Sequence, residues 1–556
     1  MLNISLKNIR TLPLTAVLCV ALLAACGGGG GGNAATTISA DQAAFNAVLV
    51  RYDAAGTATT PAAAVTAYKA AIADFTAFKA ANAGSGRIDD ADYYIARSMH
   101  ELVLLGDTTY TFANANTEYL NVVTGNLNKA DNAQFYIGKI LYDQLNYAGA
   151  IIEFDKVLNP TTYPSPSAGD DAQYYIGRSK HEQALIAQVT VNPNPTATTL
   201  FNEARTAYNV LFTATYNLST RRDDARYQIG RTYFDVAIPT ATDYSNALGH
   251  FQTVINTYGI TASSADDAQY YIGRTLHEGA LLATPPGVNY TLANAQVAYT
   301  TLLSTYAVST RRDDAQYQIG KTHFDALTPS IENYNLAIAA FNLVLSTYTT
   351  AASSADDAQY FKARSIHEKA LLAVAPATPA AGLVEARTAY GVVLSATYPV
   401  STRRDDAKYQ IGKTHFDAGD FDLALPEFEA VLTTPFTTAT VKPSVGDDAQ
   451  YFKARSMHAL ATTVAAYGTA RAEYAKVTLA NFPFSNRIDD AAFWSAFTYH
   501  DSTQCNAERT AMTSFVTAYQ SSTTPSTIVF VADANAHITD LNIAPSADSQ
   551  NHQTCI

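Results

Sequence analysis

One short phrase returns ten times along this chain of 556 residues. Its full form is an Asp pair, Ala, a polar residue, an aromatic residue, and then Gly or Ala followed by Lys or Arg, as in Asp-Asp-Ala-Gln-Tyr-Tyr-Ile-Gly-Arg from Asp170. Copies start 39 to 53 residues apart, at Asp89, Asp131, Asp170, Asp223, Asp266, Asp313, Asp356, Asp405, Asp447 and Asp489. A period in this range is typical of a solenoid, whose units bury their apolar faces only by stacking on one another. The repeat therefore favours an interaction protein over an enzyme.

Each phrase opens a predicted helix, which we call helix A. In the copy at Asp405, Ala407, Tyr409, Ile411 and Phe416 keep a helical period, and Gly412 leaves room for a neighbouring helix. Because the Asp pair stands at the start of this helix, we expect its carboxylates to cap free N–H groups at the positive end of the helix dipole.

A second pattern predicts a helix B in each unit. An aromatic residue or Leu is followed by Ala at plus three, an aromatic at plus seven and an apolar residue at plus ten, offsets that fall on one stripe of a helix. The pattern recurs at Tyr147, Tyr244, Tyr334, Phe421 and Tyr467. Each unit is therefore helix A, turn, helix B, turn.

The two patterns together resemble the tetratricopeptide repeat. In the copy at Asp405, the Gly, Gly-Asp-Tyr, Ala and aromatic signature of that family falls on Gly412, Gly419, Asp420, Phe421, Ala424 and Phe428. The Asp-Asp-Ala-x-Tyr opening and the Tyr-Pro-x-Ser closing look like the envelope branch, which includes the lipoprotein of the β-barrel assembly machinery and the partner of the Tol-Pal system. The resemblance implies an all-α, right-handed superhelical solenoid over residues 39–520. The units here are longer than usual and alternate between two types. The first type carries Arg-Ser/Thr-x-His-Glu after the phrase, and the second type has Arg-Arg before the Asp pair and Gly-Lys-Thr-His-Phe-Asp after it in its clearest copies. A pair of units therefore forms a larger repeat of about ninety residues.

The first residues predict export and a lipid anchor. Lys7 and Arg10 precede an apolar run that ends in Leu-Ala-Ala-Cys at Cys26, which is a secretory signal too short to span a membrane as a helix. The tetrapeptide resembles the bacterial lipobox, which implies removal of residues 1–25 and lipidation of Cys26; the alternative is a plain signal with a chance Cys. Residues 26–38 then form a Gly-rich tether. Gly27 follows the Cys where the inner-membrane retention signal of such lipoproteins would have Asp, so the resemblance favours the outer membrane.

Two cysteines near the other end predict a disulfide. In an exported chain, Cys505 and Cys555 most simply pair, although two free thiols are the alternative. We expect residues 521–556 to form a capping helix over about 524–543 and a tail that the disulfide holds.

A basic residue ends most phrases, and an acid follows four residues later in nearly every unit. We call this row the cation–acid ladder. In the tetratricopeptide family the matching positions face the concave groove, which implies partner-binding roles here. The ladder either only registers stacked repeats or also grips a carboxylate or an extended peptide. The candidate groove residues are Arg178, Arg231, Arg274, Lys321, Arg364, Lys413 and Arg455.

The remaining patterns predict neither catalysis nor a cofactor. The chain has no nucleophile elbow or phosphate loop, and its net charge of -13 argues against nucleic acid. Histidines recur in two columns, one that includes His100 and His181 and one that includes His323 and His415. Each helix offers one His, with ligands about 10 Å apart along the stack, so we expect packing and hydrogen bonding and no metal site; the alternative is metal binding or a response to pH. His250 and His537 belong to neither column.

These observations predict a lipid-anchored scaffold of the bacterial outer membrane. We expect it to face the periplasm and to hold a protein or peptide partner in envelope assembly. The alternative is a surface-exposed receptor or adhesin that binds a peptide or a glycan through the Tyr-rich groove.

Overall fold

The structure is a computed structural model. It describes residues 39–542 apart from 126–128, 191–194, 283, 349–352, 373–378, 434–444, 484 and 523. The predicted signal peptide, the tether, the lipidated Cys26, Cys555 and the tail beyond residue 542 lie outside the described residues. Within the described ranges, no helix combines the length and the hydropathy needed to cross a bilayer.

The described residues form 23 α-helices and no strand, which confirms the predicted all-α repeat fold. Odd-numbered helices are helix A of each pair, and even-numbered ones are helix B. The A helices are α1 (Ala40–Gly56), α3 (Ile88–Leu104), α5 (Ala130–Asp143), α7 (Gly169–Gln188), α9 (Arg222–Phe234), α11 (Ala265–Ala280), α13 (Arg312–Phe324), α15 (Ala355–Leu372), α17 (Arg404–Asp417), α19 (Gly446–Leu460) and α21 (Ile488–Asp501).

The B helices pack beside them in chain order. They are α2 (Pro61–Ala81), α4 (Phe112–Thr124), α6 (Tyr147–Val157), α8 (Ala197–Val210), α10 (Ala241–Thr253), α12 (Leu292–Thr305), α14 (Ile331–Leu343), α16 (Pro379–Leu394), α18 (Phe421–Val431), α20 (Val464–Tyr474) and α22 (Cys505–Tyr519). A final helix, α23 (Pro525–Asn542), follows the eleventh pair. Short π-helical turns extend α10 and α14, at Val254–Tyr258 and Val344–Tyr348, and a 3-10 turn spans Ala214–Tyr216.

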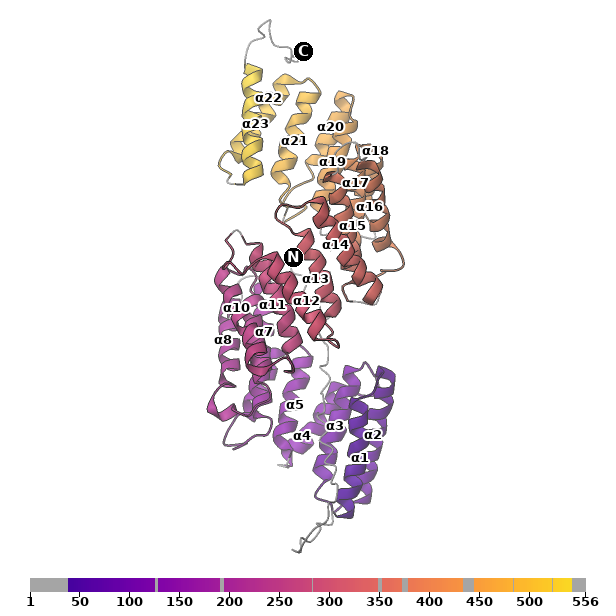
Figure 1. Ribbon diagram of the computed structural model, residues 1–556, viewed down its shortest axis with the longest axis vertical. Helices are drawn as coiled ribbons and strands as arrows, with labels where there is room; N and C mark the ends of the chain where they lie inside the picture. Colours follow the sequence, from indigo (N-terminus) through magenta and orange to yellow (C-terminus); the bar gives the residue numbers. More distant parts are fainter. Residues whose placement is uncertain are drawn as a thin grey trace. The chain divides into compact units, whose positions relative to one another are not determined.

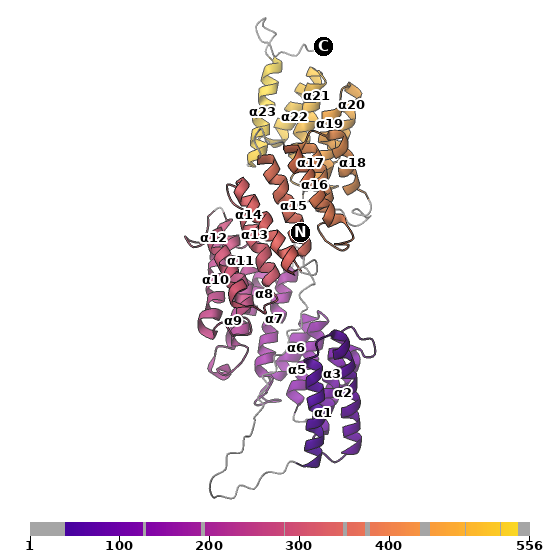
Figure 2. The ribbon, with the colours of Figure 1, turned by 45° about the vertical axis from the view of Figure 1, so that its right-hand side comes forward.

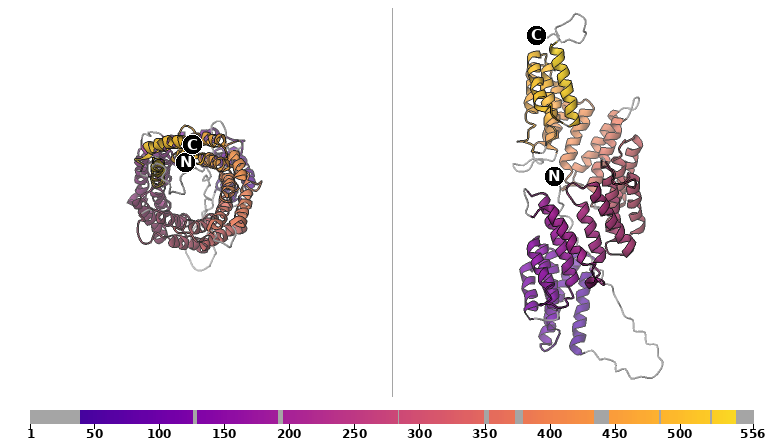
Figure 3. Two further views of the ribbon diagram at one scale, coloured as in Figure 1. Left: turned by 90° about the horizontal axis from the view of Figure 1, so that it is seen from above. Right: turned by 90° about the vertical axis from the view of Figure 1, so that its left-hand side faces the viewer.

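The chain divides after Ala268 into two compact halves. In each half, helices that follow one another in the chain pack side by side, as α7 does with α8 and α15 with α16 (Figure 1). At the C-terminal end of the second half, α21, α22 and α23 lie together (Figure 2), as the yellow helices on the right of Figure 3 also show. The last helix thus covers the end of its stack.

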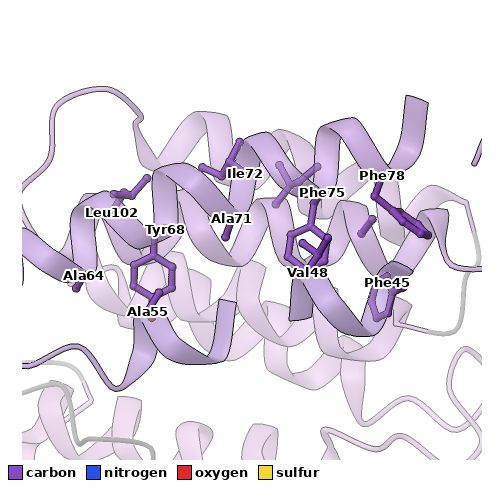
Figure 4. Packing of buried hydrophobic residues seen from close by; sticks show 12 residues of the cluster. Phe45, Val48, Ala55, Ala64, Tyr68, Ala71, Ile72, Phe75, Phe78 and Leu102 are labelled. Carbon is purple, nitrogen blue, oxygen red and sulfur yellow. The ribbon is translucent and has the colours of Figure 1, made fainter. Parts of the chain in front are cut away.

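The first helix pair shows how such a unit is filled. Phe45 and Val48 from α1 meet Phe75 and Phe78 from α2 in a buried cluster (Figure 4). Phe45 and Phe75 have ring centroids 5.8 Å apart, and Tyr94 of α3 stacks on Phe75 at 5.5 Å. Burying such rings removes apolar area from water, worth roughly 25 cal/mol per Å². The next A helix therefore completes the core of the pair before it.

Each pair from α3–α4 to α19–α20 is filled by one ring of helix B, which is Tyr in units of the first type and Phe in units of the second type, all fully buried. The last pair has Met512 at this position. In six pairs the ring lies directly against a Gly of helix A: a Cβ placed on Gly177 would be 2.5 Å from Tyr208, and one on Gly320 would be 2.5 Å from Phe341. The Gly in the phrase therefore permits the close approach of helix B that the sequence predicts.

The Asp pair has contacts beyond the predicted cap. The residues that precede α7 and α9 make no side-chain cap hydrogen bond, and the Asp pair lies inside the first turn. Asp170 Oδ2 accepts a hydrogen bond from Ser219 at 2.7 Å, and Asp171 is bridged by Arg221, both from the turn that opens the next A helix. The predicted capping is thus confirmed in part at Asp170, whose Oδ1 accepts from the backbone N–H of Asp171 at 3.0 Å, while the other contacts of this Asp pair join one unit to the next.

Side-chain caps occur mainly on the B helices, although α1 has one at Ser39 and α18 and α22 have none. Thr60, Thr196 and Thr291 each accept a hydrogen bond from a backbone N–H in the first turn of their helix. Thr and Ser at this position satisfy N–H groups that have no partner within the helix. The polar residues at the start of these B helices therefore bind backbone N–H groups of their own helix. The Asp pair at the start of α7 also contacts the next unit.

Candidate functional site

The seven candidate cations all lie on the A helices, from α7 to α19, and six of them pair with an acid one turn away. These pairs are Arg178–Glu182 at 3.6 Å, Arg231–Asp235 at 2.7 Å, Arg274–Glu278 at 2.8 Å, Lys321–Asp325 at 2.9 Å, Arg364–Glu368 at 3.2 Å and Lys413–Asp417 at 2.7 Å. Arg455 has Ala459 at the acid position, and its guanidinium donates to Tyr451 Oη at 3.1 Å. The cation–acid ladder is therefore present as predicted in its geometry.

Aromatic rings of the next A helix complete part of this ladder. Lys321 Nζ lies 3.9 Å from the ring centroid of Phe361, and Lys413 Nζ lies 4.3 Å from that of Phe452. The guanidinium carbon of Arg455 lies 3.5 Å from the Trp494 ring. A cation held over a ring face is stabilised by roughly 0.5–2 kcal/mol, more when it is desolvated. These cations thus connect adjacent units as well as the acid on their own helix.

For Arg178, Arg274 and Arg364, the matching position of the next A helix holds Gln instead of a ring. At the place of the ring, five residues after the first Asp, the second type of unit has Gln228, Gln318 or Gln410. Correspondingly, the side chains of Arg178, Arg274 and Arg364 are 26% exposed, against 18% for Lys321. The more accessible arginines therefore alternate with cations that are covered by a ring.

A second row of contacts runs beside the ladder, and the sequence analysis did not find it. In each of five units, a buried His of one A helix reaches the Asp at the end of the next A helix. The atoms Nε2 and Oδ2 are separated by 2.8 to 3.2 Å in the pairs His100–Asp143, His181–Asp235, His277–Asp325, His367–Asp417 and His458–Asp501. Four of these pairs are hydrogen bonds, and since a carboxylate only accepts, Nε2 carries the proton in those four; His181 and Asp235 lie at ion-pair distance.

The sequence carried a signal for this row. In one type of unit, the His stands eleven residues after the first Asp of the phrase. In the other type, the Asp that pairs with the His stands twelve residues after the first Asp of its own phrase. A helical residue at this register repeats on the same face of successive A helices, so complementary residues in alternating units indicate contact between units. Taken by itself, the alternation predicts only a duplicated pair of units.

Three of these acids, Asp143, Asp325 and Asp417, accept hydrogen bonds from both sides. Asp325 receives Lys321 on Oδ1 and His277 on Oδ2. Burial alone raises the pKa of Asp325, but the hydrogen bond from His277 and the charge of Lys321 together hold it below its ordinary value. Burial lowers the pKa of Lys321, and the Asp325 charge opposes that shift. The carboxylate is thus held ionised between two donors.

A pocket of about 350 Å³ opens on this face in the second half of the chain. Residues of α11, α13 and α15 line it together with Arg403, which precedes α17. They are Arg274, His277, Glu278, Leu281, Tyr317, Gln318, Lys321, Asp325, Phe361 and Arg403. Arg403 is bridged by Asp357, so all three cations of the pocket already have an acidic partner. A ligand carboxylate would therefore exchange with these acids rather than meet bare charges.

Only one cysteine of the predicted disulfide lies in the described residues. Cys505 begins α22, is 7% exposed and is disulfide-bonded. Cys555 lies outside the described residues, so its pairing with Cys505 stays a prediction.

Comparison with known proteins gives structural matches but no sequence relatives. No model of a protein family matches the chain, and no curated protein matches it. Among solved structures, the chain is similar to a STAND signal-transduction ATPase with a tetratricopeptide repeat sensor from Pyrococcus horikoshii, at 10% identity and a TM-score of 0.40, over 81% of this chain and 69% of that one. It is also similar to the tetratricopeptide repeat domain of P58(IPK), at 11% identity and a TM-score of 0.25, over 89% and 99% of the two chains. The fold assignment rests on the helix pairs described above.

Proposed function

We propose that this protein is a scaffold of the bacterial cell envelope that holds an extended segment of a partner protein along its A helices. The observation that carries the proposal is the pocket lined by Arg274, Lys321 and Phe361. It presents three cations, the Gln318 amide and two aromatic rings on one face of consecutive units. Stacked repeats continue such a face from unit to unit, which suits an extended ligand better than a compact one.

The chemistry of the pocket favours a peptide that carries acidic side chains. Arg274 offers a planar, bidentate donor and Lys321 a point charge, and each is 26% or less exposed. The Gln318 amide lies in the same lining and can pair with a peptide backbone. A ligand carboxylate would replace Glu278 or Asp325 as the acceptor, so affinity would be modest and dependent on salt.

The role in the envelope rests on the lipobox-like segment that ends at Cys26. Lipidation of this residue would fix the protein to the outer membrane, with the Gly-rich tether between the lipid and the first helix. We propose that the repeats face the periplasm and assist in outer-membrane assembly there.

Site-directed photo-crosslinking tests the binding face. A photoactivatable residue replaces Gln318 in the pocket, and a matched one replaces the exposed Leu336 on α14. We expect one discrete adduct from position 318 and none from 336. Adding Arg274→Glu with Lys321→Glu should abolish the adduct, while Lys156→Glu with Lys476→Glu, which change exposed cations elsewhere, should not. An adduct that survives the pocket substitutions would make the ladder purely structural.

The anchor and its side of the membrane need separate tests. We expect Cys26→Ser to move the protein from the membrane fraction to the soluble fraction of the envelope. Protease added to intact cells should leave the repeats uncut and should digest them once the outer membrane is permeabilised. Digestion in intact cells would overturn the periplasmic placement and favour a surface receptor, without touching the result at position 318.

A further inference from the structure

The histidines of the last units do not all behave alike. Five histidines of the A helices each pair with one Asp of the next A helix. His500 holds the same register in α21, eleven residues after Asp489, but the helix that follows the eleventh pair is α23, which does not carry the repeat phrase. Instead, His500 meets an acid from α22 and a second His from α23.

These three side chains converge on one point. His500 Nδ1 and His537 Nδ1 both lie 3.1 Å from the same oxygen, Oε1 of Glu508. One donor atom from each of the three residues lies within 4.8 Å of the others. The two imidazole rings have centroids 4.8 Å apart at an interplanar angle of 75°. Three helices therefore contribute one nitrogen or oxygen ligand each to a single small volume.

The burial and charge of Glu508 call for a cation. Its side chain is 2% exposed, and among the described residues its ion-pair partners are the two histidines. A carboxylate taken out of water is stable when it is paired or when it binds a metal.

We propose that His500, Glu508 and His537 bind one divalent transition-metal ion of the Zn²⁺ class, which ties α23 to the last helix pair. Two imidazoles and one carboxylate are a known ligand set for Zn²⁺, whereas Mg²⁺ and Ca²⁺ require mostly oxygen ligands. Bonds of about 2.0–2.2 Å in a tetrahedron place ligand atoms roughly 3.3 Å apart. The 3.1 Å separations from Oε1 already match this spacing, and the two nitrogens need only close on each other.

The surroundings suit such a site. The ring of Phe497 packs on both imidazoles, with centroids 5.1 Å from His500 and 5.2 Å from His537, which restricts their rotation. The histidine side chains are 33% and 25% exposed, so an ion can enter from solvent and keep a water as its fourth ligand. Other contacts already seat α23: Arg509 donates to the carbonyl of Leu541, and Thr527 donates to Asp489.

Metal titration of the full chain, purified without affinity-tag histidines and stripped with EDTA, tests the site. We expect one Zn²⁺ per chain by calorimetry, a rise in melting temperature with Zn²⁺ and none with Mg²⁺. Glu508→Gln and His537→Asn should each weaken Zn²⁺ binding at least 100-fold and remove the rise. His415→Asn, which changes a histidine of α17 outside the cluster, should leave both unchanged.

Histidine footprinting on the unmodified sequence covers the case in which a variant does not fold. Diethyl pyrocarbonate should label His500 and His537 in the stripped protein, and Zn²⁺ should protect both. Labelling of both residues that Zn²⁺ leaves unchanged, or equal Zn²⁺ affinity in the wild-type chain and in a folded Glu508→Gln variant, would overturn the proposal.

Discussion

His367 Nε2 lies 3.0 Å from Asp417 Oδ2, a hydrogen bond between A helices fifty residues apart in the chain. The His is 2% exposed, and Lys413 holds the other oxygen of the same carboxylate at 2.7 Å. Because the same triad recurs in alternate boundaries, each such acid both completes its own helix and fixes the unit before it. Register between repeats is therefore set by polar contacts as well as by rings.

Removing the charge of Asp417 should destabilise the protein most near neutral pH. Burial raises the pKa of this carboxyl, but the hydrogen bond from His367 and the Lys413 charge hold it below its ordinary value. A lowered pKa in the folded state means stabilisation above about pH 4 that is lost as the pH falls through the folded pKa. We expect Asp417→Asn to cost about 1–3 kcal/mol at pH 7 and less below pH 4.

Urea unfolding at a series of pH values measures this effect. Asp422→Asn, which alters an exposed acid at the start of α18, is the matched control and should change little at any pH. A double-mutant cycle with His367→Gln should give a coupling energy of about 0.5–3 kcal/mol. A coupling near zero would show that the two residues are merely neighbours.

The close approach at Gly320 should not tolerate a methyl group without cost. A Cβ there would lie 2.5 Å from the buried Phe341 ring, so the helices must separate. We expect Gly320→Ala to destabilise by about 1–3 kcal/mol. Ala stands at this register in Ala363, so the fold can accept the change, and the protein should remain folded.

Gly249 gives the opposite expectation on the same chemistry. It lies on the exposed side of α10, and nothing comes within 4 Å of an added Cβ. Gly249→Ala should therefore stabilise by about 0.5–1 kcal/mol, because it lowers the entropy of the unfolded chain. Thermal melts of the two variants would contradict the packing argument if both moved in the same direction.

The repeat made most of the fold predictable. Alternating helices, the ring of helix B and the Gly opposite it follow from periods of 3.6 residues that tandem copies repeat, and Tyr147, Ala150, Phe154 and Val157 are all buried as predicted. Helix pairs depend on contacts close in sequence, and such contacts leave a local pattern.

Contacts between units were less predictable, because they join residues 39 to 54 positions apart. Local reasoning assigned the Asp pair to capping, whereas Asp171 in fact meets Arg221. The convergence of His500 and His537 was also out of reach, since it depends on how α23 folds back on the last pair. A helix outside the repeat has no second copy from which its position could be inferred.

Buried tyrosine hydroxyls offer a test of where helix B is imperfectly satisfied. Tyr390 is fully buried, and among the described residues its hydroxyl has no hydrogen-bond partner. In the equivalent Tyr474, the hydroxyl lies 3.4 Å from His458 Nδ1. An unsatisfied buried hydroxyl costs about 1–3 kcal/mol. We expect Tyr390→Phe to leave stability unchanged or raise it, and Tyr474→Phe to lower it by about 1 kcal/mol.

Denaturant midpoints of these two variants, measured side by side, decide the point. The Phe of the second type of unit, as in Phe341, shows that the ring alone fills this position. Equal losses in both variants would mean that the hydroxyl of Tyr390 also contributes to stability, for example through bound water.

Asp224 lies at a boundary where two acids are crowded. Both Asp223 and Asp224 are 8% exposed, and Asp224 accepts from Ser263 at 3.0 Å and from Arg221 at 3.4 Å. Burial, with the neighbouring charge of Asp223, raises the pKa of Asp224 to about 6 despite Arg221. The folded state therefore prefers the protonated acid, and the stability contributed by this group falls as the pH rises from about 4 to about 6.

Replacing this acid by its neutral isostere should remove that dependence. Asp224→Asn keeps an acceptor for Ser263 and carries no charge at any pH, so we expect it to be more stable than the wild-type chain at pH 7.5, by on the order of 1–2 kcal/mol once the weakened Arg221 pair is allowed for. Near pH 4 the two proteins should unfold alike, because Asp224 is then protonated. Urea titrations at pH 4, 5, 6 and 7.5 give the difference directly. A variant that is less stable at pH 7.5 would show that the Arg221 pair outweighs the burial of the second charge.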